Sequence, residues 1–298
     1  MRTSALQPIG IRDADEVEIL WLGDARASDR AIAGGKAATL SRLSARHRVP
    51  HGFVVATNRV RLDRAARAII ATAYDRFTEM MGIPAPAVAV RSSAVDEDGR
   101  AASFAGQHES YLNVAGAEQV WWATCRCLAS FHSQRATGYR RASGLPEMPE
   151  RAAVIVQRQV PADASAVVFS ANPITGSRDE VVVNASWGLG ESIVGGTVTP
   201  DAYLIARDDL AVGRRVAVKE RMTVPVNGGT REVAVPSRVA RMPALDDADA
   251  RIAAELALAL ELEMGWPVDL ELAWAGADLF LLQCRPITTL PDDRSPAA

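Results

Sequence analysis

The chain has 298 residues, of which 48% are hydrophobic, so it can bury a sizeable core in one large domain or two smaller ones. Its formal net charge of −3 gives no electrostatic basis for binding nucleic acid or an anionic membrane. No apolar run approaches the ~20 residues that span a bilayer, the N-terminus lacks the pattern of a signal peptide, and three cysteines cannot form a disulfide framework. We therefore expect a cytoplasmic protein with no membrane span and no nucleic-acid partner.

Hydrophobic periodicity and turn residues predict alternating strands and helices in the first half of the chain. The expected elements are a strand over 17–23, a glycine turn entering a helix over 33–46, a strand over 49–58, a helix over 59–81, a strand over 84–93 and a helix over 117–140. Two prolines and three charged residues then mark 145–151 as a linker.

Short apolar runs between turn residues predict mostly strands in the second half. The expected elements are strands over 152–160, 165–173, 179–192, 202–208 and 214–224, a helix over 247–265 with Gly265 as its C-cap, and a β-hairpin over 267–287 that turns at 275–278. Helices mixed with largely antiparallel strands predict an α+β fold in two lobes. We place the N-terminal lobe at 1–148, the C-terminal lobe at 149–290 and a disordered tail at 291–298.

The first candidate for ligand binding is the sequence Gly34-Gly35-Lys36. Glycines before a helix expose backbone N–H groups and let a phosphate approach, while lysine adds a mobile positive charge. The Walker A spacing is absent, and an ordinary turn before a helix fits equally well. Composition favours the phosphate, because Lys36 and Lys219 are the only lysines among 33 basic residues. A lysine retained against that background is expected where arginine cannot replace it.

The stretch 90–114, VRSSAVDEDGRAASFAGQHESYLNV, is the second candidate. Arg91 stands at the end of an apolar strand, a position suited to aiming a guanidinium at phosphates, and small residues follow that would allow close backbone approach. A solvated surface loop explains the acidic residues 96–98 equally well. A run of roughly 25 residues without periodicity is uncommon unless it is functional or disordered, and Phe104 and Tyr111 argue against disorder.

The third candidate is the hairpin DLELAWAGADLFLLQCRP. Asp269 and Glu271 are two residues apart, as are Gln283 and Arg285, and this spacing places each pair on one face of its strand. Hairpin pairing would then bring two acids, an amide and a guanidinium onto one surface, which suits a Mg²⁺ ion that carries polyphosphate. The alternative is a solvent-facing hairpin with cross-strand ion pairs.

Other motifs carry less information. The glycine-dense stretch 184–196 contains Glu191 and fits a phosphate or substrate loop, although a single glycine-rich loop is not specific. The four histidines show no metal-binding spacing. Cys125 and Cys127 lie two residues apart on an expected helix, so their side chains diverge, and we interpret both as core or incidental residues.

Together these residues resemble a known family. The motifs GGKAATL, VPHGFVV, VAVRSSAVDEDGRAASFAGQHESYLNV, VIVQRQV, FSANPITG, ASWGLGESIVGGTVTPDAY and PVDLELAWAGADLFLLQCRPIT occur in order between about 20 and 289. They look like the ATP-binding domain of the phosphoenolpyruvate synthase, pyruvate phosphate dikinase and rifampicin phosphotransferase group. The resemblance implies an ATP-grasp-type fold, in which two lobes clamp ATP with Mg²⁺.

The resemblance also implies roles for individual residues. Those implied to be catalytic through contact with the phosphates are Lys36, Arg91 and Arg285, of which Arg285 lies beside the γ- and β-phosphates. Those implied to complete the nucleotide site are Gly106 in a glycine-rich lid, Ser110 in place of the usual threonine near it, and Gln157 near the adenine at the hinge between the lobes. Glu271 and Gln283 match the ligands of metal and nucleotide, whereas Asp269 and Glu191 lie in matched motifs without an assigned role.

In enzymes of this group, ATP phosphorylates a histidine of a Thr-Ser-His motif on a swivelling domain, and no Thr-Ser-His occurs in this chain. We therefore expect an ATP- and Mg²⁺-dependent phosphotransferase that performs a first half-reaction and passes the phosphoryl group to a histidine on a separately encoded partner protein. Two alternatives stay open: a self-sufficient small-molecule kinase or ATP-grasp ligase, and a non-catalytic nucleotide-binding regulatory module. The small-molecule acceptor cannot be read from the sequence.

Overall fold

The computed structural model describes residues 17–57, 62–95, 110–131, 133, 137–138, 141 and 152–290. Gly106, the expected linker at 145–151 and the expected tail at 291–298 lie outside the described residues. The chain forms two compact units. The first holds the described residues up to Gln159, apart from His47–Val49, which group with the second unit together with Val160 onwards.

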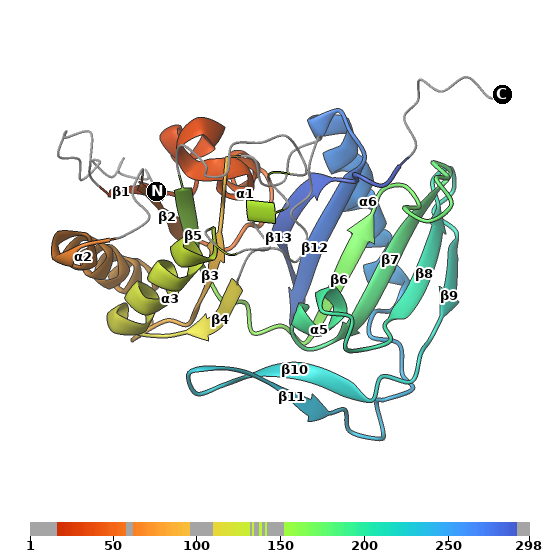
Figure 1. Cartoon of the computed structure of the whole chain (residues 1–298). Helices are drawn as coiled ribbons and strands as arrows, with labels where there is room; N and C mark the ends of the chain where they lie inside the picture. The colour runs from red at the N-terminus through yellow and green to blue at the C-terminus, as the bar shows by residue number, and fades with distance from the viewer. Residues whose placement is uncertain are drawn as a thin grey trace. The chain divides into compact units, whose positions relative to one another are not determined.

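The first unit is built on a five-stranded antiparallel sheet in the order β1-β2-β5-β3-β4 (Figure 1). Its elements are β1 (Glu18–Trp21), a 3₁₀ turn (Arg26–Ser28), α1 (Arg30–Leu43), β2 (Gly52–Thr57), α2 (Arg64–Met81), β3 (Val88–Ser92), β4 (Ser110–Val114), α3 (Ala117–Ser130) and β5 (Ala152–Arg158). The Asp63 carboxylate caps α2 by accepting from Ala66 N–H, and the helix ends at Gly82 with φ +61°.

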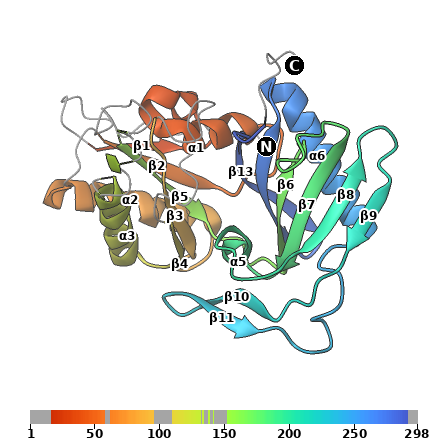
Figure 2. The same cartoon turned by 45° about the vertical axis from the view of Figure 1, so that its right-hand side comes forward.

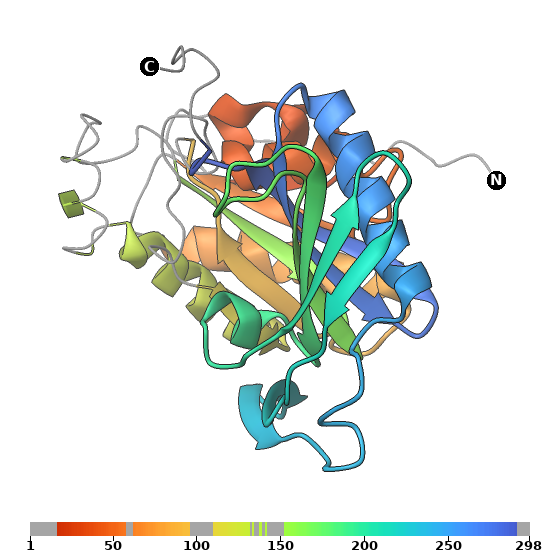
Figure 3. The ribbon, with the colours of Figure 1, turned by 90° about the vertical axis from the view of Figure 1, so that its right-hand side faces the viewer.

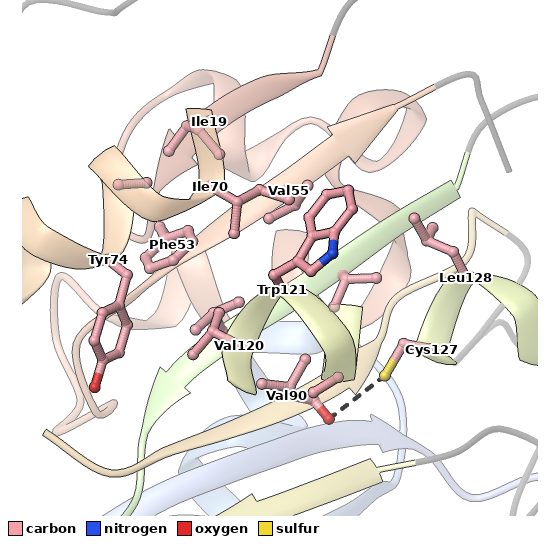
Figure 4. Close-up of a cluster of buried hydrophobic side chains, with 14 of the residues drawn as sticks. Ile19, Phe53, Val55, Ile70, Tyr74, Val90, Val120, Trp121, Cys127 and Leu128 are labelled. Atoms are coloured by element: carbon pink, nitrogen blue, oxygen red, sulfur yellow. Dashed lines mark hydrogen bonds between the residues drawn. The ribbon is translucent and has the colours of Figure 1, made fainter. Parts of the chain in front are cut away.

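Helices cover both faces of this sheet. On one face, α2 and α3 pack against alternate strand residues to form a buried apolar cluster, which Figure 4 shows around Phe53, Val90 and Trp121. Cys127 belongs to this cluster and its thiol donates to the Val90 carbonyl, 3.6 Å away, which agrees with its interpretation as a core residue. The alternating residues of β2 and β5 face the other way, where α1 packs.

The second unit is built on a six-stranded antiparallel sheet in the order β13-β12-β6-β7-β8-β9. Its elements are β6 (Ala164–Phe169), β7 (Glu180–Trp187), α5 (Glu191–Val194), β8 (Asp201–Ala206), β9 (Val212–Arg215), β10 (Arg221–Val226), β11 (Gly229–Ala234), α6 (Asp247–Met264), β12 (Val268–Ala275) and β13 (Asp278–Pro286). Figure 2 shows α6 along one face of this sheet. The expected Gly265 C-cap is confirmed, with φ +73°.

Two expected strands are placed differently. The strand expected to open the second lobe is β5, which pairs with β2 and β3 in the middle of the first sheet, so the units separate after Gln159. An apolar run fits any buried strand, and its partners here lie far away in sequence. The single strand expected over 214–224 is wrong: β9 and β10 are separate, because residues between them turn towards Asp201, which accepts from Ala217 N–H.

None of the helices that the structure describes is both long enough and apolar enough to cross a bilayer.

Candidate functional site

Lys36 lies on a helix that is interrupted just before it. Within α1, Gly34 has φ +77° and ψ 172°, a conformation that only glycine adopts readily, and the helix continues from Gly35. The turn is fastened to the end of β3: Gly35 N–H donates to the Ala94 carbonyl at 2.8 Å, and Ala37 N–H donates to Ser93 Oγ at 3.0 Å. The glycine turn expected from the sequence is thus confirmed, and it is locked against the strand that carries Arg91.

The lysine itself is withdrawn from solvent. Lys36 is only 6% exposed, and its Nζ donates to the Ser92 carbonyl at 3.4 Å. Ser92 and Ser93, which follow Arg91 in the stretch 90–114, are both buried. The Ser93 hydroxyl donates to the Ala33 carbonyl at 2.9 Å, so it fastens the turn and thereby positions Lys36.

Three predicted residues of the first unit share one face of its sheet. Val88 and Val90 face the cluster under α2 and α3, so Arg91 points to the opposite face, on which α1 packs. Ser110 lies directly opposite Arg91 in the register and therefore shares its face. Gln157 pairs with Ala89 on this same face and donates from Nε2 to the Pro50 carbonyl at 3.1 Å. The face thus presents Arg91, Ser110 and Gln157 beside the helix of Lys36.

We expect Gly34→Ala to destabilise the first unit by about 3 kcal/mol, because it combines a glycine-only conformation with overpacking. A Cβ at this position would lie 1.8 Å from the Ser93 carbonyl oxygen. Gly82→Ala is the matched control: Gly82 also has positive φ, but its Cβ would meet nothing within 4 Å, so we expect a cost of about 1 kcal/mol. Urea unfolding of both variants measures the difference, and equal losses would contradict the packing described for Gly34.

In the second unit, the predicted hairpin brings its four polar residues together. Asp269 pairs with Arg285 and Glu271 pairs with Gln283 across β12 and β13. The Arg285 Nε donates to Asp269 Oδ2 at 2.8 Å. Val268 and Leu270 are fully buried on the alternate positions, towards α6, so the polar residues occupy the opposite face. The expected shared surface is confirmed.

A β-bulge makes this arrangement possible. From the turn upward Leu272 pairs with Leu281, but the next pair is Glu271 with Gln283, so Leu282 is the extra residue on β13. Without the bulge, Glu271 would face Leu282, and Gln283 and Arg285 would point to the other face of the sheet. The bulge therefore aims both side chains at the carboxylates.

The alternative of a solvent-facing hairpin with ion pairs holds only in part. Asp269 and Arg285 do form a cross-strand ion pair, but Asp269 and Gln283 are 7% and 3% exposed. This face is therefore not an ordinary solvated surface, because buried charged and amide groups of this kind need specific partners.

The donor set fits a magnesium ion that arrives with a phosphate ligand. Glu271 offers carboxylate oxygens and Gln283 an amide oxygen, both of which are hard donors. Across the described ranges, no cluster of three or more histidine, cysteine or acidic side chains could hold a metal alone. Mg²⁺ is commonly bound by one or two protein ligands together with substrate phosphates, so a pair of donors is sufficient.

Asn184 is a residue of this face that the sequence analysis did not select. Glu271 pairs with Val167, and Val167 pairs with Asn184, so the asparagine lies in the same cross-strand row, two strands beyond Glu271. It alternates with the buried Val181 and Val183 and shares the face opposite α6. The alternation of the run VVVNAS predicts that Asn184 lies on the opposite face of its strand from Val183. Only the pairing of β12, β6 and β7 shows that it lies in the same cross-strand row as Glu271.

The glycine-dense loop packs against a neighbouring hairpin. Leu189 N–H donates to the Thr223 carbonyl at 2.9 Å, and a Cβ on Gly188 would lie 2.4 Å from that oxygen. The Glu191 carboxylate accepts from Thr230 Oγ1 at 2.8 Å. The loop is thus held by β10 and β11, and Glu191 is engaged there.

The second lysine has a structural explanation. Lys219 is fully buried and its Nζ donates to Asp201 Oδ1 at 2.6 Å. Asp201 also accepts from the backbone N–H groups of Ala217 and Ala244. Nearby, Tyr203 donates to the Leu245 carbonyl, and burial raises its pKa to about 12. Scarcity of lysine is therefore not by itself a sign of phosphate contact.

Comparison with known proteins gives a consistent picture. The family described as "Pyruvate phosphate dikinase, AMP/ATP-binding domain" matches residues 58–298. The probable phosphoenolpyruvate synthase of Methanocaldococcus jannaschii is 35% identical, with 91% of this chain and 27% of that protein aligned. The rifampicin phosphotransferase of Streptomyces sviceus is 34% identical, with 94% of this chain and 37% of that protein aligned. The phosphoenolpyruvate synthase of Pyrococcus furiosus is 38% identical, with 75% of this chain and 29% of that protein aligned.

The chain therefore spans between 27% and 37% of the length of these relatives. Among solved structures, the D-alanine–D-alanine ligase of Helicobacter pylori aligns loosely, with a TM-score of 0.34 and 11% identity over 86% of this chain and 56% of that one.

Proposed function

The chain belongs to the pyruvate phosphate dikinase AMP/ATP-binding domain family, and from this premise we propose that it binds ATP with Mg²⁺ and passes a phosphoryl group to a histidine on a phosphoryl-accepting protein domain. The observation that carries the proposal is the cross-strand pairing in the β12–β13 hairpin, in which Glu271 lies opposite Gln283 and Asp269 lies opposite Arg285. Relatives named phosphoenolpyruvate synthase and rifampicin phosphotransferase support the reaction class.

In this proposal the residues act mainly by positioning and by neutralising charge, which is most of what phosphoryl transfer requires. Glu271 and Gln283 would hold Mg²⁺, which would supply positive charge to the phosphate groups of ATP. Arg285 is kept in place by Asp269 and would contact the same phosphates. Lys36 and Arg91 would contribute further positive charge, and the buried position of Lys36 strengthens its field.

In this transfer the acceptor imidazole forms an N–P bond to the β-phosphorus of ATP while the bond between the α- and β-phosphates breaks, and AMP leaves with the electron pair. Water then cleaves the remaining phosphoanhydride bond, which releases the γ-phosphate as inorganic phosphate and leaves one phosphoryl group on the histidine. This step needs no nucleophile from the chain itself. Ser110 and Gln157 would contact the nucleotide from the sheet face that they share with Arg91. No disulfide joins Cys125, Cys127 and Cys284, all of which the structure describes, and this supports a reducing, cytoplasmic setting.

The decisive experiment adds a purified Thr-Ser-His domain from a relative to this chain with ATP labelled at the β- or γ-phosphorus. We expect AMP to form, and label to appear on the histidine, only when both proteins are present. The His→Ala variant of the added domain is the control. Formation of ADP with a small acceptor and no partner would favour a self-sufficient kinase or ligase. ATP binding without turnover under every condition would favour a regulatory module.

A further inference from the structure

One segment of the second unit carries an excess of positive charge. Residues 211–243 contain seven basic and two acidic side chains, in a chain whose net charge is −3. Within this segment β10 and β11 form a two-stranded sheet of their own. Figures 1 and 3 show this hairpin standing apart from the six-stranded sheet of the same unit. Apart from Lys219, Thr223 and Val235, which are buried, the side chains of this segment are exposed or half-buried.

Four of its arginines have no role in holding the fold. Lys219 forms a buried ion pair with Asp201. Arg214 forms an ion pair with Asp247, and Arg221 forms one with Glu232. The other four basic side chains of the segment make no ion pair or hydrogen bond within the part of the chain that the structure describes, and all four are exposed. These residues, named here the arginine patch, are Arg215, Arg231, Arg238 and Arg241.

The backbone that carries the arginine patch is fixed. Lys219 N–H donates to the Ala240 carbonyl and Val235 N–H to the Glu220 carbonyl, both at 2.9 Å. The Trp187 indole N–H donates to the Val239 carbonyl at 3.2 Å, which ties this loop to β7. A surface ordered in this way loses little conformational entropy when it binds a partner.

Its composition favours a protein as the partner. Val216, Val218 and Met242 of the same segment are 36%, 43% and 51% exposed, and apolar residues mixed with arginine and methionine are typical of protein interfaces. The segment contains no aromatic residue on which a base could stack.

We propose that the arginine patch, together with Val216, Val218 and Met242, binds a protein that presents an acidic surface with an apolar centre. Unpaired guanidinium groups attract carboxylates and can bind them in a bidentate manner, while the three apolar side chains bury area at the contact. The proposal uses none of the predicted ATP ligands, so it stands or falls independently of the phosphotransfer function.

The test measures fluorescence anisotropy of a labelled helical peptide of about 20 residues with glutamates on one face and leucines on the other, titrated with the intact chain. We expect saturable binding at about 50 mM NaCl that weakens at about 300 mM. The double variant Arg238→Glu/Arg241→Glu should weaken binding on the order of tenfold. The matched control Arg42→Glu/Arg64→Glu makes the same change of charge at two exposed arginines of the first unit and should leave the affinity within about twofold.

Circular dichroism of both double variants confirms that they are folded. No binding by the wild-type chain at the lower salt concentration would overturn the proposal, as would equal loss in the two double variants. A single-stranded oligonucleotide of about 20 nucleotides serves as the second probe. If it bound the patch more tightly than the peptide, the partner would be a nucleic acid and the proposal would be wrong.

Discussion

Glu271→Ala is expected to weaken Mg²⁺-dependent ATP binding by about 100-fold while leaving the fold intact, since loss of even an outer-shell group around a metal commonly costs 10- to 100-fold in affinity. Glu271 supplies the only carboxylate of the Glu271–Gln283 pair, so its removal leaves an amide as the sole protein donor of that pair. It is half-buried on β12, and truncation to alanine keeps the apolar side of the strand unchanged.

The measurement is calorimetric titration with ATP, with and without Mg²⁺. In the wild type we expect a large gain of affinity from Mg²⁺, and in Glu271→Ala almost none. Glu271→Gln keeps an oxygen donor but loses its charge, so its affinity should lie between the two. Glu255→Ala removes an exposed carboxylate from α6 and serves as the control for net charge. If Glu271→Ala and Glu255→Ala showed the same Mg²⁺ dependence, the metal assignment would be wrong.

The hairpin also shows how far sequence patterns reach. The spacing of Asp269, Glu271, Gln283 and Arg285 correctly predicts a shared face, because the residues are close in sequence and the turn lies between them. The bulge at Leu282 is not visible in that pattern, although the shared face depends on it. The prediction was correct because the two-residue spacing on each strand happens to agree with the register that the bulge creates. The spacing alone does not specify that register.

The α+β class follows from the same local patterns, and the antiparallel sheets confirm it. Membership of the family confirms the ATP-binding domain that the resemblance implied, whereas the ATP-grasp-type fold stays a prediction. Local patterns could not assign β5 to its sheet, because the choice depends on pairing with β2 and β3, which are distant in sequence. They also could not show that Ser93 fastens the Gly34 turn, since that contact joins residues about 60 positions apart.

The two lysines illustrate the same limit. Composition marks both as unusual, but only the structure separates their surroundings. Lys36 donates to the carbonyl of Ser92, the residue that follows Arg91 at the end of β3, whereas Lys219 pairs with a buried aspartate on β8. A rare residue type thus identifies positions that are constrained, and the contacts decide whether the constraint is a ligand or the fold.

Lys219→Met is accordingly expected to destabilise the second unit by about 3 kcal/mol, and Asp201→Ala by about 5 kcal/mol, because breaking a fully buried pair leaves an uncompensated charge. The order follows from the contacts. Without Lys219, the Asp201 carboxylate still accepts from Ala217 and Ala244 N–H. Without Asp201, both N–H groups lose their acceptor, and the ammonium group keeps only the Ala217 carbonyl and loses its counter-charge. Urea unfolding and hydrogen exchange of β8 measure these losses.

ATP binding separates this structural role from a ligand role. At a temperature where both variants remain folded, we expect Lys219→Met to bind ATP as the wild type does and Lys36→Met to bind it far more weakly. Arg221→Ala breaks the exposed pair with Glu232 and is the control for stability, with little change expected in the unfolding midpoint. Loss of ATP binding by Lys219→Met without loss of stability would contradict the structural role. Because Lys219 anchors the segment between β9 and β10, its removal should also release the backbone that supports the arginine patch.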